Sequence, residues 1–160
     1  MERIDKILHN RLFEENVEKN AAAEVDRHFC HHDMGHFLDV ARIGWIINLE
    51  EGLGLDRELI YAAALLHDIG RHDQYAEGTP HEMASAQRAR EILEECGFED
   101  RETREILEAI ASHRDDCVAG EPSLRGLLYR ADKASRPCFC CKAEQECNWK
   151  GSRKNLKVLY

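Results

Sequence analysis

The sequence has no long hydrophobic run. No apolar stretch among its 160 residues approaches the roughly 20 residues that a membrane-spanning helix needs. Residues 1–6 lack the apolar core of a signal peptide, so we expect a cytoplasmic protein without a membrane partner. The chain also has no internal repeat, low-complexity stretch or linker. With 43% hydrophobic and 33% charged residues, it is expected to form one globular domain with a single core.

An excess of positive charge is missing as well. The formal net charge is -9, which argues against broad nucleic-acid binding because such binding depends on basic surface. The charge is uneven, since the acids after Asp132 are only Glu144 and Glu146. The same region carries seven basic residues: Lys133, Arg136, Lys142, Lys150, Arg153, Lys154 and Lys157. This basic C-terminal region could face a phosphate-bearing ligand or could be a solvated tail.

Two kinds of catalytic motif are absent. We find no Ser-His-Asp or Cys-His nucleophile and no glycine-rich phosphate loop. The 7 cysteines are expected to be reduced thiols or metal ligands, because disulfides are rare in the cytoplasm. Cys138 and Cys141 have the two-residue spacing of a zinc knuckle, and Cys147 offers a third thiolate. A fourth ligand would come from Cys140, Cys30, Cys96 or Cys117, while redox sensitivity and incidental thiols remain alternatives.

Alternation of polar and apolar residues, the sign of strands, is absent, and apolar residues recur at helical spacing instead. We predict an all-α, single-domain helical bundle of about six to seven helices. The expected helices span residues 4–17 (with a break at 18–20 and a restart at 21–23), 33–51, 56–67, 80–96, 101–113 and 124–136. A loop is expected over residues 71–80. We expect Asp33, Asp56 and Thr79 to be N-caps and Pro137 to end the last helix.

One apolar helix ends in two ionisable residues. The run Ala62–Ile69 contains strong helix formers and includes the pair His67-Asp68. Unpaired polar groups inside a fold are costly, and a metal ion would offset that cost. Imidazole and carboxylate together suit manganese, iron, cobalt, nickel or zinc. The alternative is that the pair is solvated near a helix end.

Further histidines and a carboxylate are expected at the ends of other helices. His36 lies in the first turn of the helix that Asp33 opens, and His81 follows Pro80 at another helix start. His113 and Asp132 lie near the ends of two later helices. Histidines at helix ends can build a central metal pocket in an all-α bundle. His32-Asp33 is a second His-Asp pair, which we interpret as capping and surface residues, although His32 could reach the pocket rim.

In this combination the sequence resembles the HD superfamily of metal-dependent phosphohydrolases. The resemblance rests on His36 in Gly35–Ala41, on Leu66–Gly70 with its His-Asp pair, and on Tyr129–Lys133 with Asp132. It covers roughly residues 23–136 and implies an HD-type helical domain over residues 1–136. Residues 137–160 are expected to form a cysteine-rich, basic extension of the same domain.

The resemblance also implies a set of metal ligands. His36, His67, Asp68 and Asp132 would hold a first divalent ion. The extra histidines, His81 and His113, resemble the two-metal branch of the superfamily, in which Asp68 would bridge to a second ion. In one-metal members, other substrate-contacting residues take these two places. The implied cofactor is therefore one or two ions of iron, manganese, cobalt, nickel, zinc or magnesium.

The implied reaction is hydrolysis of a phosphate ester or anhydride by metal-activated water. The expected substrate is a nucleotide or another small phosphorylated metabolite. Asp68 and Arg71 are the candidate catalytic residues, and Arg71, Lys133 and Arg136 would bind the phosphoryl oxygens. Each of these cations could instead be a surface charge. The alternatives are a metal-holding ligand sensor with little turnover and a cysteine-based redox or zinc module, and exposed residues of the first helix could serve a homodimer.

Overall fold

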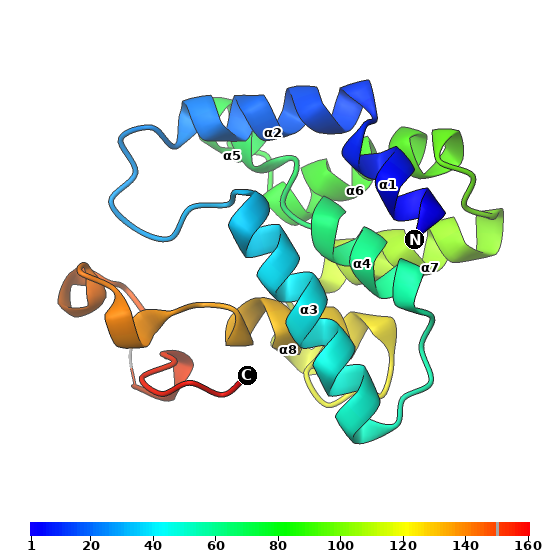
Figure 1. Ribbon diagram of the computed structural model, residues 1–160. Helices are drawn as coiled ribbons and strands as arrows, with labels where there is room; N and C mark the ends of the chain where they lie inside the picture. The colour runs from blue at the N-terminus through cyan, green and yellow to red at the C-terminus, as the bar shows by residue number, and fades with distance from the viewer. Residues whose placement is uncertain (150) are drawn as a thin grey trace.

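The computed structural model describes residues 1–149 and 151–160; Lys150, one of the basic residues named above, lies outside them. The described residues form eight α-helices and no strand, so the all-α prediction is confirmed. The helices are α1 (Glu2–Leu8), α2 (Arg11–Ala23), α3 (Met34–Glu51), α4 (Arg57–Leu66), α5 (Arg71–Glu77), α6 (His81–Glu95), α7 (Asp100–Ser112) and α8 (Leu124–Ala134), as Figure 1 shows. Short 3-10 turns η1 (Asp116–Val118), η2 (Cys138–Cys140), η3 (Glu144–Glu146) and η4 (Gly151–Arg153) complete the chain.

None of the described helices is long and apolar enough to cross a lipid bilayer.

Side-chain caps start several helices where the sequence predicts them. Asp33 accepts a hydrogen bond from the backbone N–H of His36 and so caps α3. Asp56 caps α4 in the same way through the N–H groups of residues 58 and 59. The expected cap at Thr79 is wrong, because Pro80 occupies the N-cap position of α6 and no side chain caps that helix.

The predicted break near residue 20 is wrong. The chain breaks at residues 9–10 instead, where Asn10 caps α2 through the N–H groups of residues 12 and 13. Helix α2 then continues through Asn20, which is fully buried. Asn20 donates to the backbone oxygen of Asp68 at 2.9 Å and accepts from the backbone N–H of His72 at 2.8 Å. Tertiary hydrogen bonds therefore keep this polar residue inside a helix.

The loop expected over residues 71–80 is also wrong in its first part. Residues 71–77 form α5, which ends at Gly78 in the left-handed conformation with φ 78°. Asp73 of α5 forms a two-pronged ion pair with Arg88 of α6, with both N–O distances at 2.7 Å. This contact stabilises a short helix whose own residues are mostly polar.

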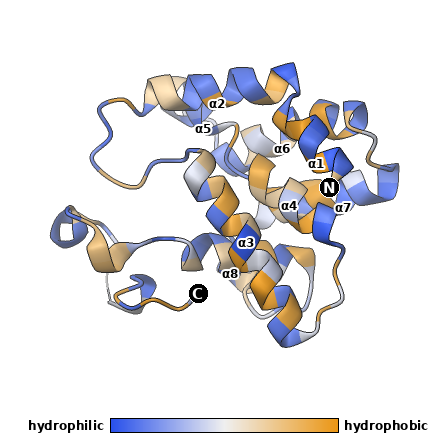
Figure 2. Cartoon of the chain, in the orientation of Figure 1, coloured by the Kyte–Doolittle hydropathy of each residue, from blue (hydrophilic) through white to orange (hydrophobic). Residues whose placement is uncertain are grey.

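The core is centred on α4, which packs against α3, α7 and α8 (Figure 1). Figure 2 shows α4 as mainly hydrophobic and α2 as mainly hydrophilic. Ala62, Ala63 and Ala64 are buried with 1% exposure or less, and these small side chains allow the neighbouring helices to approach closely. The polar residues that follow α4 therefore lie at the centre of the molecule.

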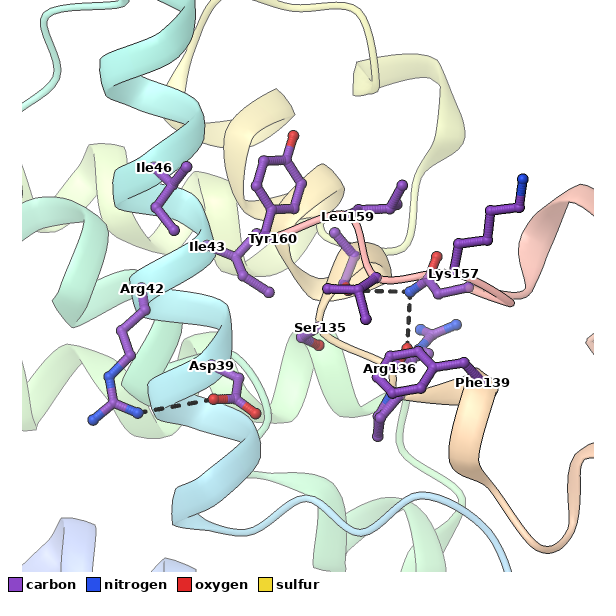
Figure 3. Close-up of a pocket in the computed structure, with 14 residues that line it drawn as sticks. Asp39, Arg42, Ile43, Ile46, Ser135, Arg136, Phe139, Lys157, Leu159 and Tyr160 are labelled. Atoms are coloured by element: carbon purple, nitrogen blue, oxygen red, sulfur yellow. Dashed lines mark hydrogen bonds and ion pairs between the residues drawn. The ribbon is translucent and has the colours of Figure 1, made fainter.

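The C-terminal segment, residues 137–160, contains only 3-10 turns among its described residues. Asn155 joins it to the body by donating to the backbone oxygens of Lys133, Ala134 and Arg136 at 2.8–3.1 Å. These bonds satisfy carbonyls at the end of α8. Figure 3 shows Tyr160 beside Ile43 of α3, and both line, with Ile46 and Leu159, a surface pocket of about 310 Å³.

Candidate metal centre

The turn after α4 is held from two sides. Asn20 of α2 binds the backbone oxygen of Asp68, and the backbone N–H of Gly70 donates to Ser85 Oγ of α6 at 2.9 Å. A Cβ at Gly70 would lie 2.5 Å from the backbone nitrogen of Ser85, so only glycine permits α6 to approach this closely. Both contacts fix the position of His67 and Asp68.

One histidine pair lies close to Asp132 and to one oxygen of Asp68. His36 Nε2 and His67 Nε2 lie 3.2 Å apart. Asp68 Oδ2 is 3.3 Å from His67 Nε2 and 3.8 Å from His36 Nε2. Asp132 Oδ1 is 3.6 Å from His36 Nε2 and 3.9 Å from His67 Nε2. We call these four residues the first cluster.

A second histidine pair faces the other oxygen of Asp68. His81 Nε2 and His113 Nε2 lie 3.2 Å apart. Asp68 Oδ1 is 3.1 Å from His81 Nε2 and 3.6 Å from His113 Nε2. Asp68, His81 and His113 form the second cluster, and all three are buried. The six residues predicted from the sequence as ligands are thus brought together, with Asp68 shared between the two clusters.

Each of the four rings has a hydrogen-bond partner at Nδ1, and that of His36 is Ser135 Oγ at 3.4 Å. His67 Nδ1 donates to the backbone oxygen of Ala64 at 2.7 Å, and His113 Nδ1 donates to that of Ile110 at 2.7 Å. His81 Nδ1 lies 2.5 Å from Gln74 Oε1 and 2.9 Å from Arg71 Nη1. A neutral imidazole that donates from Nδ1 presents a lone pair at Nε2. In their neutral forms, the Nε2 atoms of His67 and His113 that face Asp68 are therefore acceptors, which a cation can satisfy.

The pKa shifts favour neutral imidazoles at two of these positions. Burial, followed by the effect of His67, lowers the pKa of His36 to about 4. Burial is also the largest cause for His81, whose pKa falls to about 2 although Asp68 opposes the shift. A metal ligand must be deprotonated, so both rings are ready to bind a cation near neutral pH.

The carboxylates carry negative charge in the same place. Burial raises the pKa of Asp132, but the charges of Lys133 and Arg136 outweigh it and hold the pKa well below its ordinary value. Asp68 Oδ1 is buried and has no hydrogen bond of acceptable geometry to any residue that the structure describes. A buried carboxylate oxygen without a hydrogen bond is costly. The His36-His67-Asp68 and Asp68-His81-His113 groups can each hold a metal ion, and the donor set fits one.

The predicted phosphate-binding residues lie at this centre. Lys133 Nζ is 2.5 Å and Arg136 Nη2 is 3.4 Å from Asp132 Oδ2, the oxygen that faces away from the histidine pair. The Arg136 guanidinium also stacks 3.6 Å from the ring centroid of Trp149. Arg71 lies against the His81 ring, with Nη1 2.9 Å from His81 Nδ1.

A large open cleft of about 1670 Å³ leads to both clusters. Asp68, Arg71, Lys133 and Arg136 all line it. The loop before α3 and the C-terminal segment line the same cleft, and Figure 1 shows both on the side of the molecule where α3 begins. The cleft is therefore wide enough for a phosphorylated small molecule and partly basic.

Sequence reasoning placed His32 mainly at the surface and missed Glu24, although both lie beside the centre. The His32 side chain is 11% exposed and its Nε2 lies 3.7 Å from Asp68 Oδ2, so the surface interpretation is wrong and the alternative that His32 reaches the pocket holds. Glu24 is 2% exposed and pairs with His32 Nδ1 at 2.5 Å. Burial raises the pKa of Glu24, but the hydrogen bonds from His32 and Tyr75 outweigh it and lower the pKa to about 2. The high density of histidines over residues 28–36 was the only feature of the sequence that pointed to this part of the site.

The cysteines do not form a comparable cluster. Cys30, Cys138, Cys140, Cys141 and Cys147 line the same cleft, whereas Cys96 is buried elsewhere and Cys117 is exposed. In the part of the chain that the structure describes, no three cysteine sulfurs lie within 4.8 Å of one another. The geometry of the described residues therefore favours the His/Asp centre over a cysteine metal site.

Sequence comparison finds relatives of this chain among known proteins. An uncharacterized protein of Clostridium beijerinckii is 44% identical over 160 residues, which are 100% of both chains. Ribonuclease Y of Oleidesulfovibrio alaskensis is 31% identical over 107 residues, or 67% of this chain, and that of Acetivibrio thermocellus is 35% identical over 107 residues, or 65% of this chain. The matches cover only 18% of each ribonuclease. No solved structure matches significantly.

A family model gives the most direct assignment. The model of the HD domain matches residues 33–136, a span that contains both clusters. The chain therefore belongs to the HD domain family.

Proposed function

We propose that this protein is a metal-dependent phosphohydrolase that cleaves a phosphate ester or anhydride of a nucleotide or another small phosphorylated metabolite. The observation that carries the proposal is the position of Asp68, whose two oxygens face two different histidine pairs. Membership of a superfamily of metal-dependent phosphohydrolases supports the same activity.

The proposed ligands divide between two ions. His36, His67, Asp68 and Asp132 would hold the first, and Asp68, His81 and His113 the second. Divalent ions bound there would supply a Lewis acid that lowers the pKa of water and polarises a phosphoryl oxygen. Manganese, iron, cobalt, nickel and zinc suit this donor set, and magnesium remains an alternative.

The residues of the chain would position the substrate and neutralise its charge. Arg136 lines the cleft beside Asp132 and would bring a positive charge to a bound phosphoryl group. Lys133 lies next to Asp132 and adds a second positive charge. Arg71, packed on the His81 ring, would donate from the side of the second cluster. Negative charge that develops on the phosphoryl group would thus meet fixed cations.

The ribonuclease relatives raise RNA as a substrate. The net charge of -9 weighs against a long nucleic acid, because phosphate contacts along a strand need basic surface. The matched residues also make up only 18% of each ribonuclease. A small phosphorylated molecule is therefore the better proposal for this chain.

The test measures metal content and phosphate release together. Protein purified without chelator is compared with the His81→Ala, His113→Ala double variant by elemental analysis. Both are then assayed with manganese, cobalt or nickel on nucleoside monophosphates, nucleotide polyphosphates and a short RNA.

We expect the unaltered protein to hold about two ions per chain and the double variant about one. The unaltered protein should also release phosphate from a nucleotide. Metal binding without release from any substrate would favour the ligand-sensor alternative. Metal that survives replacement of His67 and Asp68 would contradict the proposed centre.

A further inference from the structure

The loop between α2 and α3 brings a fifth histidine to the candidate centre. His32 Nε2 lies 3.7 Å from Asp68 Oδ2, while His36 Nε2 lies 3.8 Å from the same oxygen. The His32 and His36 rings are 5.6 Å apart between centroids and nearly perpendicular, at 87°. His32 is thus as close to the shared carboxylate of Asp68 as His36, which is a residue of the first cluster.

Glu24 holds the His32 ring in one orientation. Glu24 Oε2 accepts from the backbone N–H of His32 at 2.8 Å, and Oε1 pairs with His32 Nδ1 at 2.5 Å. The Tyr75 hydroxyl donates to the same Oε1 at 2.6 Å. A carboxylate that receives these donors acts as an acceptor toward the ring as well, so the proton of a neutral His32 lies on Nδ1.

That assignment leaves a lone pair on His32 Nε2, the atom nearest Asp68 Oδ2. Two acceptors would then face each other across 3.7 Å, which is unfavourable unless a proton or a metal ion lies between them. Two atoms bound to one ion at about 2.1 Å each can be up to about 4.2 Å apart. The observed separation is within that limit.

We propose that His32 is an additional ligand of the metal ion at the first cluster and that Glu24 is its positioning residue. The inference rests on the proposed metal centre. A carboxylate that accepts from the distal N–H of a ligating histidine fixes the ring and increases its basicity. Tyr75 of α5 extends this arrangement, which joins the end of α2, the loop and α5.

His31 provides a matched control in the same loop. Its side chain is 48% exposed, and its Nδ1 lies 3.9 Å from Glu24 Oε2. It therefore shares residue type, loop and carboxylate neighbour with His32. It forms no ion pair with Asp68 among the described residues, so its replacement tests the loop without touching the centre.

The experiment titrates the chelator-treated protein with Co²⁺, following heat release and the visible absorption of bound cobalt. The variants are His32→Ala, Glu24→Gln, His31→Ala and His67→Ala, each checked for helical content by circular dichroism. Glu24→Gln keeps the size of a buried side chain, so it tests the positioning role if larger changes disturb the loop.

We expect His32→Ala to weaken the affinity of one cobalt ion by roughly 10–100-fold and to change the cobalt spectrum. Glu24→Gln should weaken the same ion to a smaller extent with a similar spectral change, and His31→Ala should stay within about twofold of the unaltered protein.

The two proposals fail in different ways. If His67→Ala loses one cobalt ion while His32→Ala matches the unaltered protein in affinity and spectrum, the His32 inference is overturned and the metal centre stands. If the unaltered protein binds no cobalt, or if His67→Ala binds it unchanged, the proposed centre itself is wrong.

Discussion

The carboxylate of Asp68 lies between two histidine pairs, with Oδ2 toward His36 and His67 and Oδ1 toward His81 and His113. A carboxylate can bridge two ions because each oxygen reaches one of them. An amide cannot do so equally well, since one of its two atoms is an NH₂ donor. The shared position makes this residue the most informative single substitution.

We therefore predict that Asp68→Asn binds less than one metal ion per chain. Its phosphohydrolase activity should fall by roughly 100-fold or more, which exceeds the effect expected for residues that only orient ligands. Elemental analysis and phosphate release provide the measurements. Asp26→Asn, at an exposed carboxylate outside the cleft, is the control and should behave like the unaltered protein. Full metal content in Asp68→Asn would contradict the bridging role.

Arg136 differs from an ordinary surface charge because it is fixed on both sides. It contacts Asp132 at 3.4 Å and stacks on Trp149 at 3.6 Å. We predict that Arg136→Met lowers kcat/KM for a nucleotide substrate by roughly 100-fold, the usual cost of losing one donor to developing charge. Metal content should stay near normal, which separates substrate binding from ligation.

Steady-state kinetics with parallel elemental analysis test this prediction. Arg42→Met is the matched control, because Arg42 is 62% exposed and pairs with Asp39 outside the two clusters. Equal kinetics in the two variants would remove Arg136 from the substrate-binding residues.

At the scale of elements, the turn between α4 and α5 depends on a close approach of α6. The backbone N–H of Gly70 donates to Ser85 Oγ, and a Cβ at residue 70 would lie 2.6 Å from the backbone carbon of Ala84. Backbone atoms of a helix cannot yield as a side chain can. Any larger residue at this position must displace α6, which carries His81 at its start.

We predict that Gly70→Ala destabilises the protein by about 1–3 kcal/mol, as overpacking does elsewhere, and weakens the second metal ion most. Thermal unfolding and cobalt titration measure the two effects. Gly120→Ala is the control, because a Cβ there meets no atom within 4 Å and the change should stay within about 0.5 kcal/mol. An unaltered second ion in Gly70→Ala would show that α6 does not need this contact.

At the scale of the whole molecule, the two clusters join five helices. His36 belongs to α3, His81 to α6 and Asp132 to α8, while His67 and His113 are the C-cap residues of α4 and α7. Ions bound there would crosslink these helices in the folded state only. Binding restricted to the folded state raises its stability by mass action.

We predict that metal at about 100 times its dissociation constant adds about 2.7 kcal/mol to the free energy of unfolding. For a chain of this size, that corresponds to a rise in Tm of roughly 5–10 °C. Differential scanning calorimetry with manganese or cobalt, before and after chelation, measures the shift. The same titration of Asp68→Asn should give almost no shift; a full shift there would point to ions bound elsewhere.

The sequence by itself determined the helical class and most helix bounds, and its resemblance to the HD superfamily implied the six proposed ligands. Those features depend on local rules: apolar residues at helical spacing, Asp33 and Asp56 as caps, and His or Asp at helix ends. Because these rules act over a few residues, they can be applied to a sequence without knowledge of the fold.

Only the tertiary structure decided which side chains meet across long separations. Asn20 stays helical because it binds residues 68 and 72, and α5 forms where Asp73 pairs with Arg88. His32 reaches Asp68 because Glu24, from the end of α2, holds its ring. Each contact joins segments 8–52 residues apart, and its free energy depends on geometry that spacing along the chain does not contain.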